Sequence, residues 1–337
     1  MLSVPPPPLR LSIDREALAA NWRWFRDRSG SAACGAAIKA DGYGLGAQAT
    51  LNRLAQEGGR DFFVATWAEA ALLLPLADGL RLSVLHGVRS DDLPYALASN
   101  AVPVLNTAAQ VALWRQAAPG RPCDVMVDTG MNRLGLSAHD GALLDGLNIE
   151  TLMSHLACGE EAQSLMNARQ RSLFAAIDWP AKRRSLANSG GVTLGTDYAF
   201  DLTRPGIGLY GGTPGPGTQV ARVETQIVQV REVAAGGSVG YGATFVADRA
   251  MRVAILNLGY ADGYRRAFSG GRGGAAGRKV LGRVSMDLTA IDASGGDLAE
   301  GDWIEVDFDL PAAATATGLS QYELLTGLGH RYQRSYT

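Results

Sequence analysis

Through about residue 210, short apolar runs of the chain alternate with longer stretches of helical periodicity, such as 67–76, 107–117 and 163–177. This alternation is typical of a parallel β-sheet whose strands are joined by crossover helices. Eight such runs within about 200 residues favour an α/β fold in which a closed (β/α)8 barrel of the TIM type forms. An open doubly wound sheet is the alternative, but no Gly-x-Gly-x-x-Gly follows the first run, as a dinucleotide fold would require. The predicted strands are 34–39, 62–66, 82–86, 102–105, 123–128, 151–155, 184–188 and 205–209.

The residue pattern of the sequence changes after the Gly- and Pro-rich segment 213–217. Beyond it, runs rich in β-branched residues are separated by Gly and Asp turns, which is typical of strands. In the last run, apolar side chains from Ile304 to Leu310 alternate with acidic ones, the period of a half-buried strand. We therefore predict a barrel domain of residues 10–215 and a C-terminal all-β domain of residues 216–337. The predicted strand-rich runs are 223–233, 251–258, 279–291 and 302–310.

Composition excludes several classes of protein. The 337 residues carry a net charge of -2, which gives no sign of nucleic-acid or membrane binding. No apolar run approaches the ~18 residues that a bilayer requires, and the N-terminus shows no secretory signal. The three cysteines, Cys34, Cys123 and Cys158, lack metal-ligand spacing, so we expect no metal site and a reducing, cytoplasmic location.

Unusual polar residues fall at the ends of the predicted strands. Active sites of (β/α)8 barrels lie at the C-terminal ends of the strands, where the βα loops converge. Each of these residues has an ordinary alternative by itself: a strand-end histidine is often structural, and Arg204 could form a salt bridge with Asp201. Their convergence at one barrel mouth predicts a site. The polar residues are Lys39, the segment 128–133, His155, the segment 188–191 and Arg204 with the glycines that follow it.

The chemistry of this set is specific. Lys39 ends an apolar run and enters a glycine-rich turn, and a desolvated lysine can form a Schiff base with a carbonyl. The segments 188–191 and 204–207 offer hydroxyl and backbone N–H donors of the kind that a phosphate needs. No nucleotide-triphosphate loop of the Gly-x-x-x-x-Gly-Lys type is present. A Schiff-base lysine beside a phosphate cradle points to pyridoxal 5′-phosphate.

Eight stretches in order resemble the alanine racemases, which are fold-type III pyridoxal-phosphate enzymes. The resemblance spans both predicted domains, from about residue 10 to 334. It implies that residues 1–9 join the C-terminal β-domain, and that the chain forms a head-to-tail homodimer with two shared active sites. It also implies interconversion of L- and D-alanine, which would supply D-alanine for cell-wall peptidoglycan. The matching stretches are 38–44, 127–135, 153–157, 188–189, 204–211, 239–245, 258–264 and 282–287.

The resemblance assigns two bases and their supports. Lys39 would carry the cofactor and act on one face of the substrate, and Tyr241 of the partner subunit would act on the other. The phenol of Tyr241 would be linked through His155 to Arg204, and Arg204 would face the pyridine nitrogen of the cofactor. Tyr43, Ser189 and the N–H groups of Gly206 and Ile207 would hold the cofactor phosphate, and Asn188 would also bind the cofactor. Arg133 and the Met286 backbone would orient the substrate carboxylate.

Two positions depart from the family pattern. Many members carry a carbamylated lysine that braces the substrate-binding arginine, and Met126 stands at the matching position here. Arg133 must then be oriented by Asn132, by a nearby carboxylate or by a bound anion. His330 stands where a phosphate-contacting tyrosine often lies, which leaves one phosphate contact undefined.

Other functions on the same fold stay open at this point. A racemase of broader specificity differs by a few pocket contacts worth ~1–3 kcal/mol, which one sequence does not reveal. A non-enzymatic pyridoxal-phosphate-binding protein would lack the second domain that supplies Tyr241. Decarboxylation of basic amino acids would need a C-terminal cysteine motif that is missing, and metal-assisted cleavage would need more histidines than His330 in the β-domain.

Overall fold

The computed structural model describes residues 5–337. Met1–Val4 lie outside the described residues, and with them part of the N-terminal stretch in which we expect no secretory signal and part of the predicted β-domain. The chain separates into two compact units. One is Ala17–Thr218, and the other combines Gln219–Thr337 with the described residues up to Glu16. Within 5–337, no helix has both the length and the apolar character to cross a membrane.

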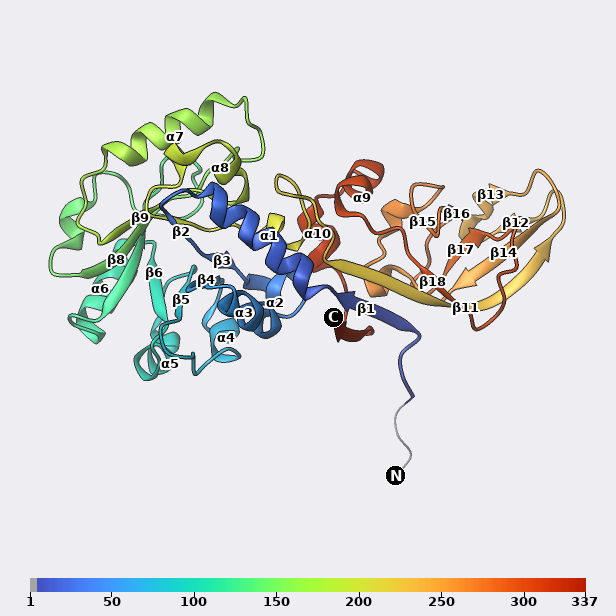
Figure 1. Cartoon of the computed structure of the whole chain (residues 1–337), viewed down its shortest axis with the longest axis horizontal. Helices are drawn as coiled ribbons and strands as arrows, with labels where there is room; N and C mark the ends of the chain where they lie inside the picture. The colour runs from blue at the N-terminus through green and yellow to red at the C-terminus, as the bar shows by residue number, and fades with distance from the viewer. Residues whose placement is uncertain (1–4) are drawn as a thin grey trace. The chain divides into compact units, whose positions relative to one another are not determined.

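Parallel strands line the first unit, with helices outside them (Figure 1). Seven strands pair in chain order from β3 to β9, each parallel to the next. The first seven predicted strands each overlap an observed strand, which confirms the alternating pattern. The strands are β2 (Ala33–Cys34), β3 (Ala36–Ala37), β4 (Asp61–Val64), β5 (Arg81–Val84), β6 (Val102–Leu105), β7 (Pro122–Met126), β8 (Asn148–Met153), β9 (Arg183–Ser185) and β10 (Leu202–Thr203).

The strand β10 closes the barrel. It pairs in parallel with β2, and the Gly35 N–H donates to the Thr203 carbonyl at 2.9 Å. On its other side, the Arg204 N–H donates to the Ala187 carbonyl at 2.8 Å, beyond the end of β9. The prediction of the eighth strand at 205–209 is therefore wrong: the strand lies earlier, and Ile207–Tyr210 form a 3₁₀ turn. Pro205 lacks the N–H that would continue a ladder, so the strand ends before it.

Helices connect the strands, and local capping sets where several of them begin. Thr107 accepts from the Gln110 N–H at the start of α6, and Thr66 with Glu69 forms a capping box at the start of α4. The predicted helices at 67–76, 107–117 and 163–177 correspond to α4, α6 and α7. The helices of this unit are α1 (Arg15–Arg28), which begins in the other unit, α2 (Lys39–Tyr43), α3 (Ala47–Gln56), α4 (Trp67–Ala71), α5 (Leu93–Ala98), α6 (Ala108–Ala117), α7 (Leu165–Ala176) and α8 (Ser189–Thr193).

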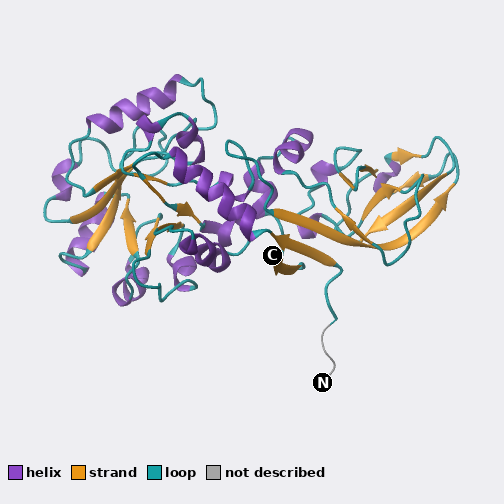
Figure 2. Cartoon of the chain, viewed as in Figure 1, coloured by secondary structure: helices purple, strands orange, loops and turns teal. Residues whose placement is uncertain are grey.

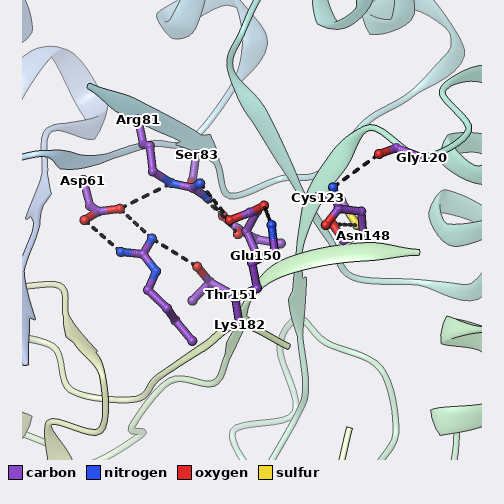
Figure 3. A network of polar contacts seen from close by, with 11 residues as sticks. Asp61, Arg81, Ser83, Gly120, Cys123, Asn148, Glu150, Thr151 and Lys182 are labelled. Carbon is purple, nitrogen blue, oxygen red and sulfur yellow. Dashed lines mark hydrogen bonds and ion pairs between the residues drawn. The ribbon is translucent and has the colours of Figure 1, made fainter. Parts of the chain in front are cut away.

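Charged side chains meet at the N-terminal ends of the barrel strands (Figure 3). Asp61 pairs with Arg183 at 2.7 Å and lies 3.5 Å from Arg81. Arg81 also pairs with Glu150 at 3.1 Å and lies 3.7 Å from Asp124. Lys182 pairs with Glu150 at 2.5 Å, and Ser83 donates to Asp124 at 2.6 Å. This base network thus balances three carboxylates (Asp61, Asp124, Glu150) against three cations (Arg81, Lys182, Arg183).

Strands dominate the second unit (Figure 2). Its main sheet runs in the order β15-β16-β17-β14-β11-β1-β19, and β18 also pairs with β11. The N-terminal strand β1 lies between β11 and β19, antiparallel to the first and parallel to the second. The strands are β1 (Leu9–Ile13), β11 (Ala221–Val233), β12 (Ser238–Val239), β13 (Phe245–Val246), β14 (Met251–Leu256), β15 (Gly274–Ala275), β16 (Arg278–Leu281), β17 (Thr289–Asp292), β18 (Trp303–Glu305) and β19 (Gln333–Tyr336).

The strand-rich interpretation of this unit is confirmed, with two local differences. The run 279–291 is two strands, β16 and β17, separated by a turn that contains Met286. The alternating segment that starts at Ile304 keeps its alternation of buried and exposed side chains, but β18 ends at Glu305. Leu310 instead begins α9 (Leu310–Thr317), which Asp309 caps, and α10 (Gln321–Thr326) follows.

Candidate active site in the barrel mouth

Lys39 stands at the start of a left-handed turn. Only Ile38 separates it from β3, and the next four residues, Ala40, Asp41, Gly42 and Tyr43, have φ angles of 54°, 52°, 61° and 56°. Residues with a β-carbon pay about 1–2 kcal/mol each for this conformation. Hydrogen bonds hold the turn, among them Gly42 N–H to the Ile38 carbonyl at 2.8 Å and Gly44 N–H to the Ala40 carbonyl at 2.7 Å. Strained backbone of this kind is typical of functional sites.

The Lys39 amine lies in a half-buried, positively charged environment. Burial lowers its pKa below the usual 10.5, and the Arg133 and Arg204 guanidinium groups lower it further, whereas the Glu69 carboxylate opposes them. A lower pKa leaves more of the amine unprotonated near neutrality. The structure therefore supplies the desolvated lysine that the sequence predicted at this position.

His155 follows β8 and lies among the same cations. Burial lowers its pKa to about 3, and the charges of Arg204, Arg133 and Lys39 act in the same direction. The imidazole is consequently neutral at pH 7. Among residues 5–337, no carboxylate lies within ion-pair distance of Lys39, Arg133 or Arg204. These cations are not neutralised within the fold, so the mouth favours anions.

Arg204 is fixed deep in the mouth. It is 6% exposed, donates to the Ser154 carbonyl at 2.6 Å and also donates to the Ser185 hydroxyl. Burial lowers its pKa to about 10. The alternative salt bridge with Asp201 does not form, because the Asp201 carboxylate accepts from the Arg184 N–H at 2.8 Å. Arg204 influences His155 through its charge, without a direct hydrogen bond among the described residues.

The predicted phosphate-binding residues converge beside this arginine. Asn188 caps α8 by accepting from the Gly191 N–H, and the buried Ser189 hydroxyl accepts from the Gly206 N–H at 2.9 Å and the Gly208 N–H at 3.2 Å. A β-carbon at Gly206 would lie 2.2 Å from the Tyr43 hydroxyl, so only glycine fits there. Tyr43 is buried and stacks on Tyr210 with ring centroids 4.7 Å apart. Ile207 opens the following 3₁₀ turn.

The loop that carries Arg133 is ordered by a carboxylate. Asp128 Oδ1 accepts from the N–H groups of Gly130, Met131 and Asn132 at 2.8, 2.9 and 3.1 Å. The loop then returns to β7, where the Leu136 N–H donates to the Met126 carbonyl at 2.9 Å. Asn132 takes a left-handed φ of 56°. Asp128 therefore orders the backbone of the loop that carries Arg133, while the brace of the Arg133 side chain stays a prediction.

Met126 belongs to the apolar barrel interior. It is 7% exposed and packs with Phe63, Val104, Met153 and Leu202, which come from four other strands. A charged side chain at this position would be buried among these apolar groups. The thioether at 126 is therefore part of the apolar core.

Two predicted site residues belong to the second unit. Tyr241 lies in a 3₁₀ turn between β12 and β13, and its side chain is 71% exposed. Met286 is also exposed, and its carbonyl accepts from the Ala261 N–H at 3.0 Å. A β-carbon at Gly259 would lie 2.2 Å from the Met286 oxygen, so glycine permits this close approach. His330 is exposed in the same unit.

Sequence reasoning missed three side chains of the barrel mouth. Glu69 accepts from the Ala40 N–H, Ser185 holds Arg204, and Tyr210 donates to the Ala37 carbonyl at 3.0 Å. The Thr66-x-x-Glu69 pattern after a predicted strand was a visible signal for a capping box. Ser185 and Tyr210 carried no comparable signal, because their roles depend on contacts between distant segments.

Pyridoxal 5′-phosphate fits the residues present in the mouth. The half-buried amine of Lys39 suits an aldehyde, and the hydroxyl and N–H groups around Ser189 and Gly206 suit a phosphate. A β-carbon at Gly206 would collide with the Tyr43 hydroxyl, so the glycine lets Tyr43 approach the backbone of this segment closely. The uncompensated charges of Arg133 and Arg204 suit the anionic groups of the cofactor and of an amino-acid substrate.

Comparisons with known proteins agree with this arrangement. The family model described as alanine racemase, N-terminal domain, matches residues 13–214, and that of the C-terminal domain matches residues 220–336. A biosynthetic alanine racemase of Agrobacterium fabrum is 41% identical over 98% of this chain and 94% of its own length.

Solved structures agree as well. An alanine racemase from Bartonella henselae with covalently bound pyridoxal phosphate has a TM-score of 0.90 and 34% identity, covering 99% of this chain and 100% of that one. The biosynthetic alanine racemase from Pseudomonas aeruginosa has a TM-score of 0.90 and 31% identity, covering 99% of this chain and 100% of that one. With both halves of the chain matched and the barrel-mouth residues in place, this chain belongs to the alanine racemase family.

Proposed function

We propose that this chain is an alanine racemase, which interconverts L- and D-alanine with pyridoxal 5′-phosphate held on Lys39. The observation that carries the proposal is the Lys39 amine itself, half-buried at the barrel mouth with a lowered pKa and flanked by Arg133 and Arg204. The proposed reaction supplies D-alanine for peptidoglycan, and the biosynthetic names of two similar proteins support this role. We place the enzyme in the cytoplasm.

When bound, pyridoxal phosphate supplies an electron sink that makes the alanine Cα–H acidic enough for a side chain to remove. Racemisation then needs a proton acceptor and donor on each face of Cα. Lys39 Nζ serves one face, and the phenol oxygen of Tyr241 of the partner subunit serves the other. The 71% exposure of Tyr241 within its own unit supports its use by a second copy in a homodimer with shared sites.

The remaining residues bind and orient the cofactor and the substrate. Arg204 keeps its proton at any ordinary pH, so beside the pyridine nitrogen of a bound cofactor it would not give that nitrogen a proton. Burial and the charge of Arg204 keep His155 neutral, and in this proposal His155 links the partner's tyrosine to Arg204 electrostatically, without a direct hydrogen bond from Arg204. Tyr43, Ser189, Gly206 and Ile207 hold the phosphate, and Asn188 also binds the cofactor. Arg133 and the Met286 N–H hold the substrate carboxylate.

A complementation experiment tests the shared site. Lys39→Ala subunits and Tyr241→Ala subunits are each expected to be inactive, because each lacks one of the two bases. After equal mixing and exchange, half of the dimers are mixed, and each mixed dimer has one complete site, so roughly a quarter of wild-type activity should return. No recovery, with subunit exchange verified, overturns the shared geometry.

Chemical trapping tests the covalent link. Borohydride treatment of the wild-type holoenzyme, followed by peptide mapping, should place the pyridoxyl label on Lys39, and label on another lysine overturns the assignment. A panel of L-amino acids then separates an alanine racemase from one of broader specificity. Turnover confined to alanine is expected.

A further inference from the structure

Glu69 reaches out of its own helix toward the lysine turn. Its Oε2 accepts from the Thr66 N–H at 3.4 Å, which is the contact of the capping box, and from the Ala65 N–H at 2.6 Å, just after the end of β4. Its Oε1 accepts from the Ala40 N–H at 2.8 Å, although Ala40 lies 29 residues earlier in the chain. One carboxylate therefore joins the end of β4 to the residue that follows Lys39.

A second capping box in the chain shows that the contact with Ala40 is additional. At the start of α10, Ser320 and Glu323 form the same reciprocal pair, and Glu323 Oε2 accepts from the Ser320 N–H at 3.0 Å. The hydrogen bonds of Glu323 stay within its own helix start. Capping alone consequently does not require the contact that Glu69 makes with Ala40.

The contact lies at residues whose backbone conformation is strained. Ala40 has φ 54° and ψ 47°, and Asp41 has φ 52° and ψ 53°. This left-handed conformation is unfavourable by about 1–2 kcal/mol for each residue with a β-carbon. The Ala40 N–H is part of the peptide bond that begins at the Lys39 carbonyl. Holding this N–H therefore fixes the direction in which the Lys39 backbone leaves β3.

The Glu69 carboxylate also acts on the Lys39 amine. The charges that shift the Lys39 pKa are those of Arg133, Glu69 and Arg204, and the glutamate is the one that raises it. The same carboxylate thus supports the turn by hydrogen bonding and moderates the positive field around the amine.

We propose that Glu69 is a positioning residue whose carboxylate clamps the left-handed turn after Lys39 to the end of β4 and so fixes the place of the Lys39 amine in the barrel mouth. The inference rests on the proposed function only in that Lys39 carries the reaction. Glu69 itself touches neither the cofactor nor the substrate in this proposal.

The test compares Glu69→Gln with Glu323→Gln. Each variant replaces the carboxylate of a capping box by an amide of the same size, but only the first affects Ala40. In cofactor-free protein, competitive acetylation by acetic anhydride across a pH series, read by mass spectrometry, gives the pKa of Lys39. Glu69→Gln should lower this pKa relative to wild type, and Glu323→Gln should leave it unchanged.

In the holoenzyme, Glu69→Gln should lower kcat by up to about 100-fold, the cost of a misplacement of about 1 Å, with a smaller change in KM. Glu323→Gln should keep the wild-type kcat. A Glu69→Gln variant that matches Glu323→Gln in both the Lys39 pKa and kcat overturns the proposal.

A second variant separates the clamp from a general loss of folding. Adding Ala40→Gly to Glu69→Gln removes most of the left-handed cost at residue 40. The double variant should fold and recover part of kcat, while the Lys39 pKa stays low because the charge is still missing. If the double variant recovers no kcat, or neither variant folds, the clamp is overturned. Borohydride label missing from Lys39 in the wild type would instead overturn the proposed function.

Discussion

At the N-terminal ends of the barrel strands, the base network sets three carboxylates against three cations, whereas at the C-terminal ends Lys39, Arg133 and Arg204 lie without an ion-pair partner among residues 5–337. Both groups of charges belong to the same barrel, but they have different roles. Charges at the base neutralise one another and stabilise the fold. Charges at the mouth oppose folding slightly and become neutralised only when anionic ligands bind.

The largest expected effect comes from breaking the base network. Asp61 is 6% exposed and pairs with Arg183, so Asp61→Ala leaves the half-buried charges of Arg183 and Arg81 with one carboxylate fewer. The free energy of unfolding should fall by about 3–5 kcal/mol, measured by urea denaturation. Activity per folded molecule should stay at the wild-type level.

The control for this prediction is an exposed ion pair. Asp197 pairs with Arg171 at 3.4 Å, and its side chain is 77% exposed. Asp197→Ala should cost less than about 1 kcal/mol. If both variants lost the same free energy of unfolding, the base network would stabilise the fold no more than an exposed ion pair does.

A mouth variant should show the opposite pattern. Arg133→Gln removes a cation that lowers the pKa of Lys39 and that we assign to the substrate carboxylate. KM for alanine should rise by roughly 10- to 100-fold, because a hydrogen bond to a charged group contributes about 1.5–3 kcal/mol. The free energy of unfolding of the cofactor-free protein should change by less than about 0.5 kcal/mol.

Arg169→Gln, an exposed arginine on α7, is the matched control and should change neither KM nor stability. If Arg133→Gln instead destabilised the protein as Asp61→Ala does, the mouth would be a second structural network.

The smallest expected effect is on the pH dependence of the free energy of unfolding. Burial raises the pKa of the Asp124 carboxyl above its usual 3.8, although the Ser83 hydroxyl and Arg81 oppose the rise. Between 3.8 and the raised pKa, the folded state binds more protons than the unfolded state. Stability therefore falls as pH rises through this window, by up to about 1.4 kcal/mol per pH unit from this group.

Asp124→Asn cannot titrate, so this part of the slope should disappear. Urea denaturation of wild type and variant from about pH 4 upward measures the difference. Parallel pH profiles for the two proteins would show that Asp124 does not contribute to the pH dependence.

The barrel and its functional face were predictable from the sequence because periodicity and strand-end residues are local signals. Lys39, His155 and Arg204 lie at the mouth that the alternation predicted, and the family resemblance supplied their roles. The eighth strand was misplaced because β10 contains only Leu202 and Thr203, and so short a strand has no period. Its position is set by pairing with β2, which lies far away in the chain.

Other features depended on the folded backbone. The left-handed φ angles at Ala40 and Asp41 carry no sequence signature, since neither residue is glycine. The contact between Glu69 and Ala40 joins two segments whose proximity follows only from the parallel pairing of β3 and β4. The replacement of a charged brace by Met126 was visible in the sequence, but the three N–H donors to Asp128 were not.

The position of β1 has a consequence for synthesis of the chain. This strand emerges first, yet its sheet partners are β11, which begins at Ala221, and β19, which ends at Tyr336. On a ribosome, the intervening barrel residues are translated before either partner exists, and domains fold as units during translation. The barrel can thus fold on the nascent chain, while the sheet of the β-domain is completed only after β19 has been synthesised, and a chain truncated before β19 leaves β1 with an open edge.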